Sequence, residues 1–140
     1  MIAQLSSQKI VTKEYSNLAG FDTAVAFTVT GDVEVEFFGL VPTTALTCTG
    51  GITSLSLGTT GGVSTFLGSD LIDNVNNFQI GDVWSSAGAD APYGTWSAKK
   101  IIGGGQDVTL TRSVDDITAG DLKLYCKFTA LSAGASVVAA

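Results

Sequence analysis

The stretch FDTAVAFTVTGDVEVEFFGLV, residues 21–41, decides the fold class, because apolar and polar residues alternate along it. The first run places three apolar residues on one face, Val25, Phe27 and Val29. The second run does the same with Val33, Val35 and Phe37. A period of two is typical of β-strands with one buried face and one wet face. The letters TGD between the two runs predict a tight turn or a bulge.

Working outward, the same pattern recurs along most of the chain, with turn signals every 8 to 12 residues or so. It predicts roughly eight to ten short strands, and the length of 140 residues suits one domain. We therefore expect an all-β, single-domain antiparallel β-sandwich or barrel that is jelly-roll-like. Residues 1–20 alternate weakly and are interpreted as an extended N-terminal arm or a short first strand, which leaves residues 21–140 as the domain.

Four local expectations complete this prediction. Pro42 should end a strand or mark an edge, because proline cannot donate to a ladder. Asp70 to Val75 could form a short helical turn, with Ser69 or Asp70 as its N-cap. Gly103 to Gly105 should connect two strands as a hairpin. The tail LSAGASVVAA, residues 131–140, is small, apolar and uncharged.

Charge and hydropathy exclude two classes of partner. Charged residues make up 14% of the chain, and the net charge is −6. Nucleic-acid binding needs a basic patch, and only Lys99 and Lys100 are adjacent. No apolar run approaches the ~20 residues that span a bilayer, and the N-terminus lacks the pattern of a secretory signal. We expect synthesis in a cytoplasm, no nucleic acid and no membrane.

The glycine-rich run LGTTGG, residues 57–62, is interpreted as a turn between two strands. A phosphate-binding loop needs a lysine after its second glycine and a helix that starts there. Here Val63 and Ser64 follow, and the flanking residues alternate as strands do.

Catalytic groups are scarce. The chain has no histidine, which is the commonest general base. Glu34 and Glu36 share a strand face, and we interpret them as a solvated acidic face rather than as an acid–base pair. Asp115 and Asp116 suit a turn, and the asparagines near Asp73 lack the spacing of a calcium loop. The sequence predicts no enzyme, no cofactor and no metal.

The two cysteines, Cys48 and Cys126, both lie on apolar strand faces. We interpret them as buried free thiols, because such thiols behave as small hydrophobic groups in cores. A disulfide would be unusual for a cytoplasmic product.

Three aromatic residues, Trp84, Tyr93 and Trp96, cluster around a long loop. Buried, they would close one end of the sandwich or contact another subunit, which is the interpretation we prefer. Exposed, they could stack on a sugar.

Longer stretches of the chain resemble a group of small tailed-bacteriophage virion proteins. The similar parts are VTGDVEVEFFGLVPTTALTCTGGITSLSLGTTGGVSTFLG (residues 29–68), DVW (82–84) and LKLYCKFTALSAGASVVAA (122–140). They match a "G-x-V-x-V" strand, an "I-S-L-G-T-T-G" turn and an "L-S-x-G-A-x-V-x-A-A" end. The resemblance covers about residues 25–140 and carries over no catalytic residue.

The resemblance implies a virion protein that decorates and stabilises the outside of the phage head as a homotrimer, with the major capsid protein as its partner. On this hypothesis we expect subunit or capsid contacts at Gln4, Ile10, Tyr15, Trp84, Tyr93, Trp96, Val137 and Val138. A tail or fibre component and a carbohydrate-binding module are the alternatives.

Overall fold

The structure is a computed structural model that describes residues 8–50, 53–72, 80–81, 84–85, 100–103, 105–113 and 115–140. These residues form ten β-strands and no helix. The strands are β1 (Gln8–Tyr15), β2 (Thr23–Thr30), β3 (Val33–Cys48), β4 (Ser54–Thr59), β5 (Gly62–Ile72), β6 (Trp84–Ser85), β7 (Lys100–Ile102), β8 (Val108–Ser113), β9 (Ile117–Ala130) and β10 (Ser136–Ala139).

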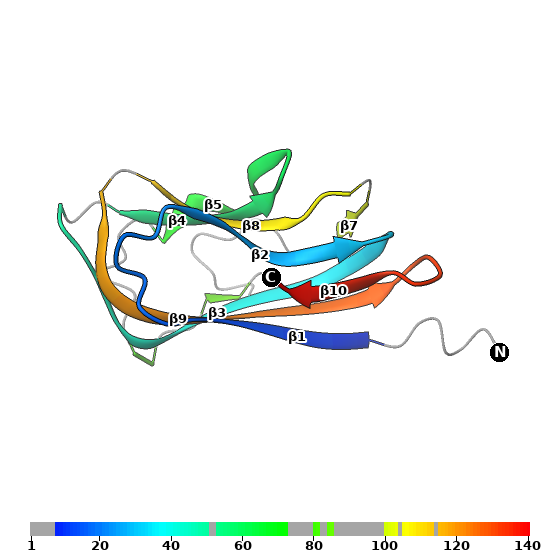
Figure 1. Cartoon of the computed structure of the whole chain (residues 1–140), viewed down its shortest axis with the longest axis horizontal. Helices are drawn as coiled ribbons and strands as arrows, with labels where there is room; N and C mark the ends of the chain where they lie inside the picture. Colours follow the sequence, from blue (N-terminus) through cyan, green and yellow to red (C-terminus); the bar gives the residue numbers. More distant parts are fainter. Residues whose placement is uncertain are drawn as a thin grey trace.

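The strands pair antiparallel in two sheets that face each other (Figure 1). Sheet A has the order β1-β9-β3-β6, with β7 also paired to β3, and sheet B has the order β10-β2-β8-β4-β5. Successive strands change sheet at most connections, which gives the strand orders of a jelly roll with β10 added beside β2. The predicted all-β antiparallel sandwich is confirmed.

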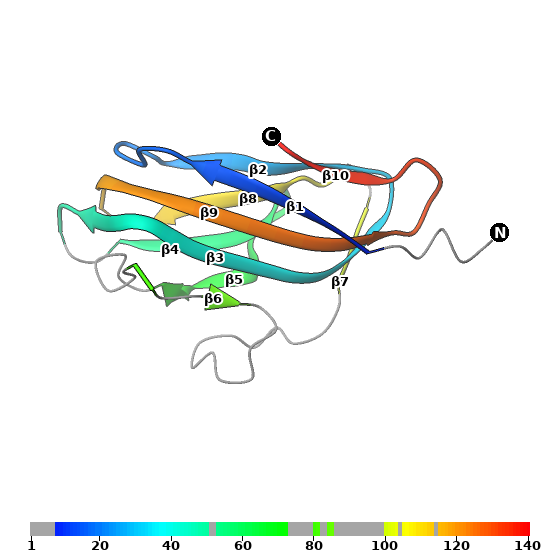
Figure 2. The same ribbon diagram turned by 90° about the horizontal axis from the view of Figure 1, so that it is seen from below.

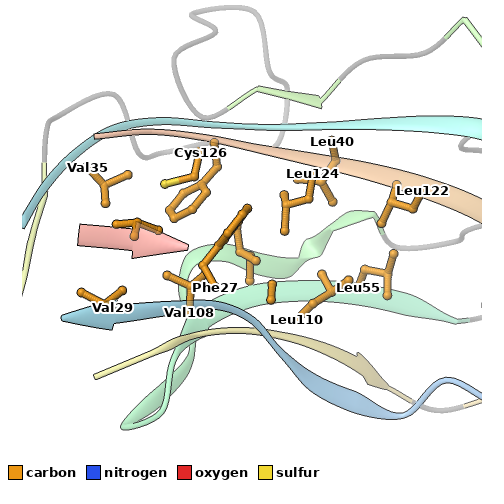
Figure 3. Close-up of a cluster of buried hydrophobic side chains, with 14 of the residues drawn as sticks. Phe27, Val29, Val35, Leu40, Leu55, Val108, Leu110, Leu122, Leu124 and Cys126 are labelled. Atoms are coloured by element: carbon orange, nitrogen blue, oxygen red, sulfur yellow. The ribbon is translucent and has the colours of Figure 1, made fainter. Parts of the chain in front are cut away.

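Apolar side chains from both sheets fill the space between them (Figure 3). On β9 the apolar stripe predicted from the sequence is buried at every position, namely Leu122, Leu124, Cys126 and Phe128. Phe27 of sheet B and Phe38 of sheet A stack across the sandwich, with ring centroids 6.4 Å apart. These contacts between sheets supply the hydrophobic stabilisation that neither sheet has alone.

Two β-bulges change which side chains face the core. In β2 the pairing with β8 shifts between Val25 and Phe27, so Val25 points outward while Ala26 and Phe27 are both buried. In β3 the pairing with β9 shifts between Val35 and Phe37, and the buried residue that follows is Phe38. The prediction of one continuous buried face was therefore wrong for Val25, before the bulge in β2, and for Phe38, after the bulge in β3, because an extra residue reverses the alternation.

Three local predictions were also wrong. β3 continues through Pro42, which lies where the ladder with β9 is irregular and tolerates a missing N–H. The segment from Asp70 to Ile72 belongs to β5 and not to a helical turn, while residues 73–79 lie outside the described part. The glycines at 103–105 do not make a hairpin, because β7 pairs in sheet A and β8 in sheet B.

Two turn predictions are confirmed. Thr60 and Gly61 connect β4 to β5, with Thr59 paired to Gly62, so LGTTGG is a hairpin turn. Gly31 has a φ of 68° and starts the turn that takes the chain from sheet B to sheet A. At this position a Cβ would lie 3.1 Å from the Cα of Ala135, so glycine is needed for both conformation and space.

For residues 1–20 the sequence suggests an extended arm or a short first strand, and residues 8–15 form a strand. β1 pairs with β9 along its whole length, from Gln8 opposite Thr129 to Tyr15 opposite Leu122 (Figure 2). β1 and β10 each lie at one edge of their sheet, and Lys13 Nζ donates a hydrogen bond to the main-chain oxygen of Ala140. The first described strand is thus tied to both β9 and the last strand.

At one end of the sandwich, Arg112 of β8 joins two connections, the one from β1 to β2 and the one from β8 to β9. Its Nε donates to the carbonyl oxygen of Phe21 at 2.8 Å, and Nη1 donates to that of Asp115 at 3.0 Å. Nη2 lies 3.1 Å from Asp22 Oδ1 and 3.4 Å from Asp116 Oδ1. The aspartates at 115–116 therefore belong to a turn held by an arginine, as the sequence suggested.

We expect Arg112→Ala to lower the free energy of unfolding by about 2–3 kcal/mol, because it leaves two carbonyl groups without their charged donor. Lys123→Ala is the control, since Lys123 forms an exposed ion pair with Glu14 (3.2 Å) and such pairs contribute little. Urea denaturation of both variants measures the difference. Equal stability of the two variants would contradict a structural role for Arg112.

The two cysteines are free and far apart. Cys126 is opposite Phe38 in β3, and Cys48 lies ten residues further along that strand, which corresponds to roughly 30 Å. Burial raises the pKa of the Cys126 thiol to about 12, whereas Cys48 is only partly buried. A disulfide between them is incompatible with this fold.

We expect a thiol reagent at pH 8 to modify Cys48 in the native protein and both thiols in guanidinium. The physical reason is that a buried thiol stays protonated and inaccessible, and the thiolate is the reactive form. Titration with a chromogenic disulfide measures the count, and Cys48→Ala should leave no thiol that reacts in the native state. Rapid native modification of Cys126 would contradict its burial.

Candidate interaction surfaces

The outer face of sheet A carries charge. Alternate residues of β1, β3 and β9 point away from the core, and the charged ones include Glu14, Glu34, Glu36, Lys123 and Lys127. Lys123 Nζ lies 3.2 Å from Glu14 Oε1, and this contact is the main cause that raises the pKa of Lys123. The charges of this face are thus partly neutralised by neighbours on adjacent strands.

Glu36 is less solvated than the sequence suggested. Its side chain is only 14% exposed, and its Oε2 accepts a hydrogen bond from Gln8 Nε2 at 2.6 Å and lies 3.5 Å from Lys127 Nζ. The interpretation of a solvated acidic face was therefore wrong for Glu36. Because an amide and an ammonium group hold this carboxylate, it is not free to act as an acid or a base in catalysis.

The outer face of sheet B has a different chemistry. We call its open part the hydroxyl face, which consists of Thr23, Val25, Thr28, Thr30, Ser136 and Val138. These residues come from the neighbouring strands β2 and β10, where Thr28 is opposite Val138 and Thr30 is opposite Ser136. Hydroxyl and methyl groups make up this face, and none of its six residues is ionisable.

The hydroxyl face ends where sheet B becomes covered. Thr23 Oγ1 lies 3.0 Å from Thr111 Oγ1, so the hydroxyl pattern continues onto β8. On β4, however, Ser54 and Ser56 are buried, and Thr109 Oγ1 on β8 is shielded from solvent without a hydrogen-bond partner among the described residues. Among the side chains of sheet B whose burial is described, an open group therefore lies on β2 and β10.

A third feature is a group of exposed aliphatic side chains at one end of sheet A. Ile10 is 68% exposed and Ile101 is 69% exposed. Across sheet A, Ile101 is opposite Glu34, Glu34 is opposite Thr129, and Thr129 is opposite Gln8. Ile10 is two residues along β1 from Gln8, so the two isoleucines lie near the same end of the sheet. Leu131 follows β9 at the same end and is half exposed.

The predicted contact residues fall into three groups. Ile10 and Val138 have side chains open to a partner. Val137 is 4% exposed and packs in the core of its own chain, so only Val138 of that pair is available for contact. Tyr15 packs its ring edge-to-face on Phe21, and burial raises its pKa to about 12.

The remaining predicted residues are not placed by the structure. Gln4, Tyr93 and Trp96 lie outside the described residues. Trp84 is in β6 with its backbone opposite Leu40, and its side chain is not among those described. The predicted cluster of three aromatic residues therefore remains a prediction.

Sequence reasoning missed the exposure of Ile101 and of Val25. In the run Lys100-Ile101-Ile102, either of the two adjacent isoleucines could be buried by sequence alone. The pairing with β3 places Ile102 in the core and leaves Ile101 exposed. Val25 was assigned to the core because the bulge beside it leaves no clear mark in the sequence. No local signal distinguishes these outward residues from core residues.

The described residues contain neither a candidate metal site nor a candidate membrane-spanning helix. No group of three His, Cys, Asp or Glu side chains is placed there to hold a metal ion. None of the described residues belongs to a helix long and apolar enough to cross a membrane. The features that remain are surfaces and edges.

Comparison with known proteins identifies the fold. No protein-family model and no curated protein sequence matches this chain. Among solved structures, it is similar to a chain titled "Cyanophage Pam1 capsid asymmetric unit", with a TM-score of 0.61, 12% identity and coverage of 89% of this chain and 86% of the other. It is also similar to a chain titled "Acidic stable capsid structure of Helicobacter pylori bacteriophage KHP30", with a TM-score of 0.56, 11% identity and coverage of 96% of both chains. At these identities the likeness shows a shared fold over almost the whole length.

Proposed function

We propose that this chain is a structural protein of a bacteriophage particle that decorates and stabilises the outside of the capsid as a homotrimer. The observation that carries the proposal is the likeness in fold, over nearly the whole chain, to chains from two phage capsid structures. The sequence resemblance to small phage virion proteins supports the same assignment independently of the fold.

The chemistry of the surface agrees with a structural role and not with catalysis. The chain contains no histidine. Cys126 is buried with a raised pKa, and Glu36 is engaged by Gln8 and Lys127. A protein that acts by binding needs exposed contact surfaces instead, and the hydroxyl face and the aliphatic group at Ile10 and Ile101 are such surfaces.

A decorating protein is present in many copies, so weak contacts are sufficient. Each copy binds a shell that carries its neighbours, and the summed contacts hold the layer even when a single contact is weak. The major capsid protein is the proposed partner, and the virion is the proposed location.

Immunogold labelling of intact virions of the encoding phage tests this proposal. Antibody against the chain should label the outside of the heads in many copies, and antibody that has been absorbed with the purified chain is the control. Labelling confined to tails would replace the head by a tail or fibre role. Absence of the chain from purified virions, measured by mass spectrometry, would overturn the proposal altogether.

A further inference from the structure

The distribution of charge over the two sheets is uneven. The chain carries 20 charged residues and a net charge of −6, yet the sequences of β2 (TAVAFTVT) and β10 (SVVA) contain none of them. The outer face of sheet A, by contrast, carries acids and lysines on three adjacent strands. The outward side chains of β2 and β10 therefore form an uncharged surface on an acidic chain, with the Asp107 carboxylate beside it as acceptor for the main-chain N–H of Val29.

This distinction matters most for contact with a copy of the same chain. Two copies that each carry −6 repel one another, and like charges brought together at an interface cost several kcal/mol. The centres of protein interfaces are depleted of charged residues for the related reason that charges are costly to desolvate. The hydroxyl face lets two acidic copies approach without either cost.

The hydroxyl face is also complementary to itself. A threonine or serine hydroxyl is both a donor and an acceptor of hydrogen bonds, so a hydroxyl group can pair with an identical one, as Thr23 does with Thr111 within the chain. A carboxylate only accepts and an ammonium group only donates, so neither can pair with an identical group of a second copy. Val25 and Val138 add exposed methyl groups that a second copy would cover.

We propose that the hydroxyl face is the surface through which copies of this chain bind one another. Val138 on β10 and Thr28 on β2 form its centre, because they are directly opposite in the sheet and both are exposed. β10 lies beside β2 at the edge of sheet B (Figure 2). In a trimer, three such faces turn toward the threefold axis, each touching both neighbours. The charged face of sheet A then remains in solvent.

This inference rests on the proposed self-association and adds the surface that performs it. It is tested by measuring the mass in solution with size-exclusion chromatography and light scattering, for the whole chain and three variants. Val138→Glu and Thr28→Glu place a carboxylate on the hydroxyl face. Ile101→Glu is the matched control, because it places the same carboxylate on an exposed aliphatic position of sheet A.

We expect the unmodified chain and Ile101→Glu to have about three times the mass of the 14.3 kDa chain. The two hydroxyl-face variants should be monomeric, with association weakened roughly a hundredfold or more, since several kcal/mol correspond to at least two factors of ten. Thermal melting must show that each variant is folded. A second measurement at 1 M NaCl should leave the mass of the unmodified chain unchanged, because the contact contains no ion pairs.

Two outcomes overturn the inference. If the hydroxyl-face variants keep the oligomer, or if Ile101→Glu alone dissociates it, the contact lies elsewhere. If the unmodified chain is a monomer at all concentrations, copies do not bind through this face in solution. Labelling of intact virions decides the capsid role separately, so the two proposals can fail independently.

Discussion

Phe27→Ala and Phe38→Ala are each expected to lower the free energy of unfolding by about 3–5 kcal/mol. Both rings are fully buried, and they stack at 6.4 Å between centroids, one from β2 of sheet B and one from β3 of sheet A. Truncation removes apolar contact with the opposite sheet and leaves a cavity at the centre of the sandwich. A loss of this size is a large part of the stability of a typical small domain.

Urea denaturation, monitored by tryptophan fluorescence or circular dichroism, measures this effect. The variants should unfold at a lower midpoint concentration of urea, while the dependence of the unfolding free energy on urea concentration stays the same. Val25→Ala is the matched control, because Val25 lies on the same strand as Phe27 but points outward. We expect it to remain within about 0.5 kcal/mol of the unmodified protein. A loss below about 1.5 kcal/mol for both phenylalanines would contradict the packing of the two sheets through these rings.

The second large effect is expected at Gly120, where Gly120→Ala should destabilise the fold by about 4 kcal/mol. Its φ of 126° lies in a region that other residues occupy only with strain of about 1–3 kcal/mol. An added Cβ would also lie 2.8 Å from the Cα of Leu46 and 2.9 Å from the carbonyl oxygen of Ala45. Overpacking against a backbone costs a further 1–3 kcal/mol or so, because the backbone cannot rotate away.

Gly105→Ala separates these two causes. Gly105 also has a positive φ, 76°, but no atom lies within 4 Å of its added Cβ. Only the conformational cost of about 1–2 kcal/mol should remain there. The same denaturation experiment compares the variants, and equal losses at both positions would show that the close approach of β9 to β3 at Gly120 contributes nothing.

Several features of the fold could be predicted from the sequence because they depend on neighbouring residues. The alternation in Leu122-Lys123-Leu124-Tyr125-Cys126 correctly predicted one buried face of β9, since successive side chains of a strand point to opposite sides. The turn at Thr60 and Gly61 was predictable from its glycines and from the lack of a lysine. The strand end predicted at Pro42 and the hairpin predicted at the glycines 103–105 were wrong, because the conformational preferences of proline and glycine permit more than one arrangement.

The candidate surfaces depended more on tertiary structure. Among the residues predicted to make contacts, Ile10 and Val138 are exposed and Val137 is in the core, while the contacts themselves remain a prediction. Adjacent valines in β10 look alike in the sequence, and the pairing of Val137 with Val29 is what turns that side chain inward. The contrast between a charged sheet A and an uncharged hydroxyl face appears only when strands far apart in the chain are assigned to their sheets.

By itself, then, the sequence determined the fold class and most of the strands, because a period of two is a local property of the chain. The lack of histidine is likewise known from the composition alone. The tertiary structure decided the side on which Val25 and Phe38 lie, the sheet that each strand joins and the face that stays open. These outcomes follow from bulges and pairings between distant strands, whose energies depend on partners that no short stretch of sequence contains.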